Sequence, residues 1–324
     1  MSDIAFLFPG QGSQYSGMGR ALAERYPAAR RVFDDADRIL DFSVSRLCFE
    51  GPAEELKKTE NTQVALLTVS VAAYRVLEES GYRAALVAGH SLGEYSALVA
   101  AKSLEFGDAL RLVRKRSRYM QEAVPEGVGA MAAILKLPTE QLDRVLQEAA
   151  QGQVVSAANL NSPDQVVIAG HAKAVERAMV IAKAAGARRT IALAVSAPFH
   201  CSLMRPAQMR LRADLDATEF KDLSIPLINN WEARVADRGA EARQGLYEQI
   251  PNPVRWTDSM REMAKHGIRR FVEVGPGAVL TGLARSIDST LCGAKFGEPG
   301  DLDSVRALIH EQPLLDREYP VRQT

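Results

Sequence analysis

The sequence predicts an α/β fold built on a central, mostly parallel sheet, with a second, smaller domain inserted into it. Short apolar runs at 4–8, 84–88 and 271–274 alternate with longer helical patterns, which is typical of buried parallel strands. A hydrophobic fraction of 47% in 324 residues is sufficient for a large core. Between 127 and 197 the order of the elements changes, and this change predicts the inserted domain.

The first element is a buried strand, Ile4–Phe8, which ends in the polar glycine-rich loop 9–14. This loop lacks the Lys-Ser/Thr pair of a P-loop and the third glycine of a dinucleotide fingerprint, so it predicts no phosphate cradle. It offers backbone and amide donors at the carboxyl end of a strand, where open α/β sheets bind ligands; a plain turn is the alternative. Helices are expected over 20–40, from Pro52, and over 62–81.

A strand–turn–helix pattern surrounds Ser91. The apolar run 84–88 predicts a buried strand, and good helix formers follow from Leu92. Between them, Gly89-x-Ser91-x-Gly93 is the pattern of a sharp turn that presents a serine hydroxyl at the tip of a strand. An oxyanion formed on an acyl group at Ser91 would meet the backbone N–H of Leu92. A buried glycine–serine turn without chemistry is the alternative.

Arg116 departs from the pattern of the helix predicted over 105–123. The apolar face of this helix consists of Phe106, Ala109, Val113 and Met120. The other basic side chains point toward solvent: Arg111, Arg114, Lys115 and Arg118. Arg116 falls within the apolar face, and a guanidinium directed inward requires an anion or several acceptors. It is therefore either half of a structural ion pair or a two-pronged clamp for a substrate carboxylate.

The inserted domain is predicted from the order of its elements. Strands are expected over 130–135, 154–158, 166–169 and 190–195, with helices over 139–150 and 172–185. This order, strand–helix–strand–strand–helix–strand, is that of the ferredoxin-like unit. His171 lies at a strand–helix junction of this domain and is interpreted as a cap or surface residue.

His200 is the histidine best placed to act as a general base. It follows the inserted domain at the start of a new helix, where it can face a cleft; a structural histidine is the alternative. His90 is adjacent to Ser91, and neighbouring side chains diverge on a sharp turn. Cys201 is interpreted as a small buried residue and not as half of a Cys–His pair.

The last third of the chain supplies further strands and turns. A strand is expected at 225–229, followed by a polar surface segment and by a turn at 249–256, whose prolines leave carbonyls free to orient a neighbouring imidazole. A strand at 271–274 ends in a glycine loop and precedes a helix over 278–286. The polar tail 311–324 is expected to be poorly ordered.

Composition argues against several classes of function. The formal net charge is +0, so no overall field favours nucleic acid or a membrane. No apolar run approaches the length of a membrane span. Met1-Ser2-Asp3 leads into the first strand without a basic n-region, so a signal peptide is not expected. The 3 cysteines, Cys48, Cys201 and Cys292, are too few and too widely spaced for a disulfide framework or a zinc site. We therefore expect a soluble cytoplasmic protein.

Motifs along nearly the whole chain, from about 5 to 299, follow one another in a specific order. They are Phe8–Gln14, Gly89–Glu94, Gln121–Gly127, Gly129–Met131, Asn161–Pro163, Pro198–His200, Asn252–Val254 and Val274–Gly277. In this order they resemble the bacterial malonyl-CoA:acyl-carrier-protein transacylases. The resemblance implies a large α/β-hydrolase-like catalytic domain, formed by 1–126 and 198–324, and a small ferredoxin-like domain over 127–197.

The resemblance also implies roles for individual residues. Ser91 corresponds to the nucleophile and His200 to its base, while Gln11 and the Leu92 N–H correspond to the oxyanion hole. Arg116 corresponds to the arginine that holds the malonyl carboxylate.

Two further positions follow from the same resemblance. The family orients its histidine with a backbone carbonyl, at the position of Gln249, where an α/β-hydrolase would use an acidic side chain. Phe199 and Leu92 resemble the residues of members that take malonyl in preference to methylmalonyl groups.

The implied reaction is a ping-pong transfer of malonyl from malonyl-CoA, through Ser91, to the pantetheine thiol of an acidic acyl carrier protein in fatty-acid synthesis. No permanently bound cofactor, metal, nucleic acid or membrane is expected, and the protein is expected to be a monomer. Three alternatives remain: a polyketide acyltransferase acting in trans, a serine thioesterase or hydrolase, and a catalytically silent scaffold. A hydrolase would have no need of Arg116, and a scaffold would have no use for the whole set of residues.

Overall fold

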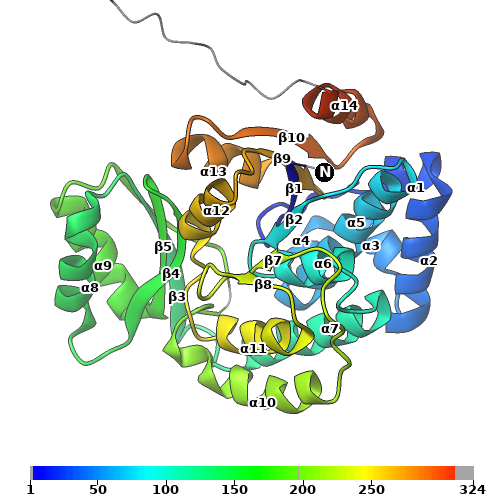
Figure 1. Cartoon of the computed structure of the whole chain (residues 1–324). Coiled ribbons are helices and arrows are strands. Elements are labelled where there is room, and N and C mark those ends of the chain that lie inside the picture. The colour runs from blue at the N-terminus through cyan, green and yellow to red at the C-terminus, as the bar shows by residue number, and fades with distance from the viewer. Residues whose placement is uncertain (1–2, 196, 311–324) are drawn as a thin grey trace, which may run out of the picture.

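The computed structural model describes residues 3–195 and 197–310. Within these residues the chain forms a six-stranded sheet surrounded by helices and a separate four-stranded sheet at one side (Figure 1). The predicted tail at 311–324 lies outside the described residues.

The larger sheet confirms the predicted central, mostly parallel sheet. Its strands are β1 (Ile4–Phe8), β2 (Leu86–Gly89), β7 (Leu227–Ile228), β8 (Val235–Ala236), β9 (Arg270–Val274) and β10 (Cys292–Phe296). Their order is β10-β9-β1-β2-β7-β8, and each pair is parallel except β7 with β8. Phe8 pairs with Gly89, so the loops after β1 and β2 begin side by side at one edge of the sheet.

Helices cover both faces of this sheet. They are α1 (Arg20–Arg25), α2 (Pro27–Leu40), α3 (Val44–Glu50), α4 (Ala53–Lys57), α5 (Thr59–Glu79), α6 (Gly93–Ala100), α7 (Phe106–Glu122), α10 (Arg205–Asp216), α11 (Gly239–Gln249), α12 (Trp256–Lys265), α13 (Val279–Ile287) and α14 (Leu302–His310). Side chains alternate along a strand, so Phe6 and Phe8 of β1 pack into the core with α5, whereas Ala5 and Leu7 pack with α12 and α13.

The smaller sheet has the predicted ferredoxin-like topology. It contains β3 (Gly129–Leu135), β4 (Val155–Ser162), β5 (Gln165–His171) and β6 (Arg189–Ala192), with helices α8 (Leu142–Ala150) and α9 (Ala172–Ala184). The strand order is β4-β5-β3-β6 and the pairs are antiparallel. One face packs against α8 and α9 through Ile134 and Ile168, whereas Met131 and Ala169 on the other face belong to the main core. The ranges proposed above for the two domains stay a prediction.

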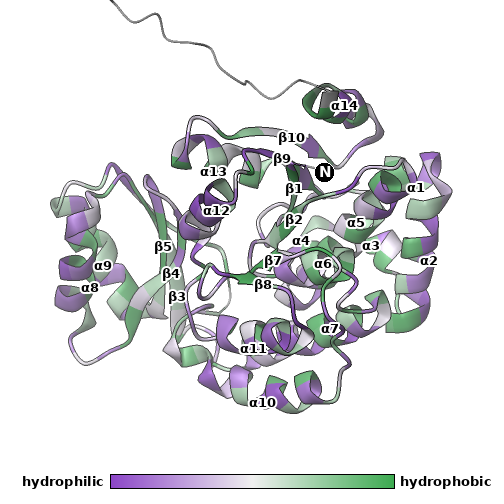
Figure 2. Ribbon diagram, viewed as in Figure 1, coloured by the Kyte–Doolittle hydropathy of each residue, from purple (hydrophilic) through white to green (hydrophobic). Residues whose placement is uncertain are grey.

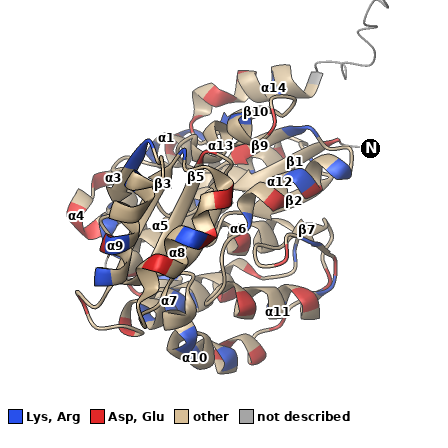
Figure 3. Cartoon of the chain, turned by 90° about the vertical axis from the view of Figure 1, so that its left-hand side faces the viewer, with Lys and Arg blue, Asp and Glu red and all other residues tan. Residues whose placement is uncertain are grey.

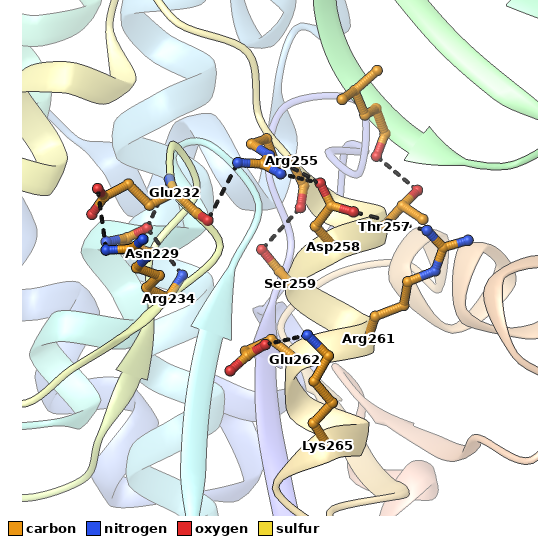
Figure 4. A network of polar contacts seen from close by, with 11 residues as sticks. Asn229, Glu232, Arg234, Arg255, Thr257, Asp258, Ser259, Arg261, Glu262 and Lys265 are labelled. Carbon is orange, nitrogen blue, oxygen red and sulfur yellow. Dashed lines mark hydrogen bonds and ion pairs between the residues drawn. The ribbon is translucent and has the colours of Figure 1, made fainter. Parts of the chain in front are cut away.

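Polar contacts at the start of α12 join the two sheets. The backbone N–H of Val254 donates to Ala158 O, and that of Leu160 donates to Val254 O, each at 2.9 Å. Thr257 Oγ1 then donates to Leu160 O of β4 at 3.0 Å (Figure 4). In the same network Arg255 pairs with Asp258 at 2.8 Å, which fixes the first turn of the helix. The smaller sheet is thereby held next to the loops of the larger one.

Three elements differ from the expectations drawn from the sequence. The single helix expected over 20–40 is two helices, because Tyr26 is extended before Pro27, as residues before proline prefer to be. The polar surface segment after 229 contains β8 and α11, and Gln249 at the end of α11 is buried. β4 continues to Ser162, four residues beyond the end of the strand expected over 154–158.

Hydropathy and charge follow this architecture. Individual helices carry both hydrophilic and hydrophobic residues, as expected of helices that cover a core (Figure 2). Acidic and basic residues are interspersed on the face shown in Figure 3, in keeping with a formal net charge of +0. In the part of the chain that the structure describes, no helix combines the length and apolarity needed to span a membrane.

Candidate active site

Ser91 occupies a sharp turn between β2 and α6. Its φ of 50° lies in the left-handed region, which costs a residue other than glycine about 1–2 kcal/mol. The flanking glycines are required by close backbone approaches. A Cβ on Gly93 would lie 2.0 Å from Phe8 O, and one on Gly89 would lie 2.0 Å from the carbonyl carbon of Gly93. The backbone therefore presents the Ser91 hydroxyl at the tip of its strand, as the sequence predicted.

His200 lies next to Ser91 although 109 positions separate them in the chain. Ser91 Oγ and His200 Nε2 are 2.7 Å apart, and His200 Nδ1 lies 2.9 Å from the backbone oxygen of Gln249. A carbonyl oxygen only accepts, so Nδ1 carries the proton and Nε2 of the neutral ring accepts from the serine hydroxyl. His200 also has a positive φ, of 57°. Both members of the pair are thus held in an uncommon backbone conformation.

The surroundings keep the His200 ring neutral. Burial lowers the pKa of His200 to about 3, and the positive charge of Arg116 acts in the same direction. The backbone bond to Gln249 opposes this effect but is weaker. An unprotonated imidazole beside a hydroxyl is the form that can accept its proton.

Arg116 projects from α7 into the same site, and 1% of its surface is exposed. Its guanidinium donates to Gln63 Oε1 at 2.7 Å, to Gln249 Oε1 at 2.8 Å and to Ser91 Oγ at 3.0 Å. Among the described residues no carboxylate lies within ion-pair distance of Arg116, and its Nε has no hydrogen-bond partner. A buried cation held by neutral oxygens, next to a nucleophile, is suited to binding an anionic group.

The Leu92 N–H and the side-chain amide of Gln11 are the two candidate donors beside Ser91. The N–H of Ser91 itself is not available, because it donates to Asn230 Oδ1 at 2.7 Å. The Leu92 N–H and the side-chain amide of Gln11 make no hydrogen bond within the described residues. Gln11 follows β1 and Leu92 follows β2, so the pairing of these strands brings them to the same edge of the sheet. Both remain available for an oxyanion.

The two candidate donors line a cavity of about 100 Å³ at Ser91. Its wall consists of Gln11, Gln63, His90, Ser91, Leu92, Met120, Met131, Asn159, Leu193, Val195, Phe199 and His200. A second cavity, of about 370 Å³, shares five of these residues: Gln11, His90, Asn159, Leu193 and Val195. The smaller cavity is bounded by both sheets, since Met131 belongs to β3 and Ser91 follows β2.

Several buried polar residues of the site were missed by the sequence analysis. Gln63 faces Arg116 from the otherwise largely apolar helix α5, and that contrast was a usable signal. Asn230 follows β7, the neighbour of β2, and its Nδ2 donates to Gly89 O at 2.7 Å. Glu94, in the first turn of α6, is fully buried beside Gln249. Asn230 and Glu94 depend on contacts between distant segments, which no local pattern reveals.

His90, His171 and Cys201 lie as the sequence analysis interpreted them. His90 Nε2 faces Asn161 Oδ1 at 2.8 Å and not Ser91. His171 occupies the N-cap position of α9, and its Nδ1 accepts from the Val154 N–H. Cys201 is buried, its Sγ contacts Pro198 O, and burial raises its pKa to about 11, so it is a poor nucleophile.

Comparison with known proteins identifies the family of this chain. The family model described as "Acyl transferase domain" matches residues 5–294. The malonyl CoA-acyl carrier protein transacylase of Escherichia coli (strain K12) is 50% identical over 300 residues, which are 92% of this chain and 97% of that protein.

Two solved structures have nearly the same fold as this chain. A crystal structure of an acyl carrier protein S-malonyltransferase from Vibrio cholerae has a TM-score of 0.92 and 46% identity, covering 94% of this chain and 100% of the other. A malonyl-transacylase in complex with its type II PKS acyl-carrier protein has a TM-score of 0.91 and 47% identity, covering 94% and 98%. By its sequence, its fold and the family model that it matches, the chain belongs to the malonyl CoA-acyl carrier protein transacylase family of acyl transferases.

Proposed function

We propose that this protein transfers a malonyl group from malonyl-CoA to the pantetheine thiol of an acyl carrier protein. The observation that carries the proposal is the buried guanidinium of Arg116, 3.0 Å from Ser91 Oγ and without an ion-pair partner among the described residues. An acyl group bound to Ser91 places its far end near this cation, so an acyl group that ends in a carboxylate is favoured. Family membership supports the same reaction.

In the first half-reaction, His200 Nε2 takes the hydroxyl proton as Ser91 Oγ bonds to the thioester carbon of malonyl-CoA. The Leu92 N–H and the Gln11 amide stabilise the oxyanion that forms. When the carbon–sulfur bond breaks, His200 returns the proton to sulfur and coenzyme A leaves as a thiol. Gln249 O keeps the imidazole oriented throughout by accepting from Nδ1.

In the second half-reaction, the pantetheine thiol gives its proton to His200 while its sulfur attacks the malonyl ester. The carbon–oxygen bond breaks, and Ser91 Oγ recovers the proton from the imidazole. We propose that the pantetheine arm reaches Ser91 through the second cavity, which adjoins the acyl cavity and carries the amides of Asn159 and Asn161. Phe199 bounds the acyl cavity, and we propose that it limits the size of the acyl group.

Three broader expectations stay part of this proposal. The acceptor is an acidic carrier protein of fatty-acid synthesis. A polyketide carrier protein is the second candidate, because a similar transacylase has been solved in complex with a type II PKS acyl-carrier protein. The enzyme works as a monomer in the cytoplasm, in keeping with its three free cysteines. The serine hydrolase alternative leaves Arg116 without a purpose.

The proposal is tested by intact mass spectrometry. Malonyl-CoA alone should add one malonyl group to the wild-type protein and to a Cys201→Ala control, and none to Ser91→Ala. Addition of holo carrier protein should then move the malonyl group to the carrier thiol, with little free malonate. Labelling of Ser91→Ala would contradict the assignment of the nucleophile, and malonate as the main product would identify a hydrolase.

A further inference from the structure

Glu94 is a buried carboxyl group to which the proposed reaction assigns no role. It lies in the first turn of α6, three positions after Ser91, and its surface is 0% exposed. Its Oε2 accepts from Gln249 Nε2 at 2.9 Å and from the Asn230 N–H at 3.0 Å. Glu94 therefore contacts Gln249, whose side chain in turn contacts Arg116.

The Gln249 side chain connects Glu94 to Arg116 because its amide has two different ends. Its Nε2 donates to Glu94 Oε2 and also faces two further acceptors, Ser91 O at 3.0 Å and Asn230 Oδ1 at 3.3 Å. Its Oε1 is thereby directed toward Arg116 Nη2, at 2.8 Å. The reversed amide would place an NH₂ group against the guanidinium, and neither group accepts hydrogen bonds.

Glu94 makes the shortest of the three contacts that set this orientation, at 2.9 Å from Gln249 Nε2 against 3.0 Å for Ser91 O and 3.3 Å for Asn230 Oδ1. All three oxygens also accept from a backbone N–H, but only Glu94 can carry a negative charge, which strengthens a hydrogen bond. Burial raises the pKa of Glu94 to about 7, whereas its bonds to Gln249 and Asn230 and the charge of Arg116 lower it. Glu94 Oε1 has no partner, so Oε2 remains an acceptor whether or not Oε1 carries a proton.

We propose, on the basis of the function above, that Glu94 is a positioning residue for acyl selectivity: it holds the Gln249 amide with its oxygen toward Arg116, and so aims the guanidinium at the acyl group on Ser91. This effect is separate from the base. His200 is oriented by the main-chain carbonyl of Gln249, which does not move when the side-chain amide turns.

The proposal distinguishes two variants of the same residue. Glu94→Gln retains an oxygen that can accept from both donors, whereas Glu94→Met has a similar length and no acceptor. We expect the ratio of kcat/KM for malonyl-CoA over acetyl-CoA to fall at least ~10-fold in Glu94→Met, because the loss of one oriented hydrogen bond changes such a ratio about tenfold. In Glu94→Gln the ratio should stay within about threefold of its wild-type value. Glu273→Gln, at another fully buried glutamate, serves as a control for lost stability alone.

Two measurements separate positioning from general damage. Phenylmethanesulfonyl fluoride is a neutral reagent for activated serines. Its reaction reports on Ser91 and His200 and needs no carboxylate contact with Arg116, so Glu94→Met should react within about threefold of the wild-type rate. The double variant Glu94→Met/Gln249→Ala should have the same acyl ratio as Gln249→Ala, because both changes interrupt one connection. Three results would each overturn the proposal. The first is a folded Glu94→Met variant with an unchanged acyl ratio, and the second is an equal loss of its reactivity toward malonyl-CoA, acetyl-CoA and phenylmethanesulfonyl fluoride. The third is additive effects of the two substitutions in the double variant.

A readout without substrate keeps this inference distinct from the proposed function. The side-chain ¹⁵N–¹H₂ signals of Gln249, assigned by their loss in Gln249→Ala, should shift in Glu94→Met and stay close to their wild-type positions in Glu94→Gln. A wild-type protein that transfers no malonyl group would refute the function while the amide signals still test the contact. Amide signals insensitive to Glu94→Met would refute the positioning role whatever the substrate.

Discussion

Replacement of Arg116 should change the preference of the enzyme for malonyl-CoA over acetyl-CoA. In the free enzyme the guanidinium is held by neutral oxygens of Gln63, Gln249 and Ser91. A malonyl carboxylate adds charge-assisted hydrogen bonds, each contributing about 1.5–3 kcal/mol, while the methyl group of an acetyl adds none. Two such bonds amount to at least ~3 kcal/mol, so the wild-type enzyme should prefer malonyl-CoA by at least ~100-fold.

The assay is the ratio of kcat/KM for malonyl-CoA and acetyl-CoA in wild-type protein and in Arg116→Ala, Arg116→Lys and Arg111→Ala. Arg116→Ala should lose malonyl transfer by ~100-fold or more and retain acetyl transfer. Arg116→Lys should recover only part, because an ammonium lacks the planar fork. Arg111 lies on the same helix, exposed and paired with Asp108, so Arg111→Ala should leave the ratio at its wild-type value. An unchanged ratio in folded Arg116→Ala would show that selectivity arises elsewhere.

The remaining predictions concern the base, the elbow and the partner. His200→Ala should slow formation of the acyl-enzyme by roughly a thousandfold, measured by rapid quench; near wild-type rates would refute the role of base. Because the pKa of His200 falls to about 3 on folding from a reference value near 6.5, the unfolded chain binds the proton more readily below pH ~6.5. Stability should therefore decline as the pH falls from ~6.5 toward 3, by at most ~1.4 kcal/mol per pH unit from this group, and urea unfolding of His200→Gln should lack that contribution. Gly93→Ala should abolish activity and lower the melting temperature, because its Cβ would lie 2.0 Å from a backbone oxygen; wild-type melting would contradict the close approach. Carrier docking should depend on a local basic surface that includes Arg114, Lys115 and Arg118, so the KM for carrier should rise with salt and with charge reversal there; indifference to both would exclude this surface.

Local patterns predicted those parts of the fold and site that short segments determine. Ser91 was predicted because a strand, two glycines and a helix adjoin it in the chain. Arg116 was predicted because α7 is long enough for its periodicity to separate an inward residue from outward ones. In both cases the signal lies within a few turns of backbone.

The remaining parts depend on contacts between distant segments. α11 contains few apolar residues, so its burial and that of Gln249 follow from the packing around them and not from its pattern. β10 is an edge strand without apolar alternation, and α14 follows it closely. Asn230 reaches Ser91 because β7 pairs with β2, a pairing that a local pattern does not specify.

The close contact of the glycine-bearing turns has a consequence for how this enzyme can change. A Cβ on Gly10 would lie 2.4 Å from His90 O, and one on Gly93 would lie 2.0 Å from Phe8 O, so the loop that carries Gln11 and the turn that carries Ser91 meet backbone to backbone. Main-chain atoms have no rotamers, so substitutions in the surrounding core have little means of altering the spacing between oxyanion donor and nucleophile. The acyl cavity, by contrast, is bounded by side chains such as Met120, Met131 and Phe199. Laboratory evolution toward other acyl groups can therefore vary these walls while the reacting atoms keep their positions.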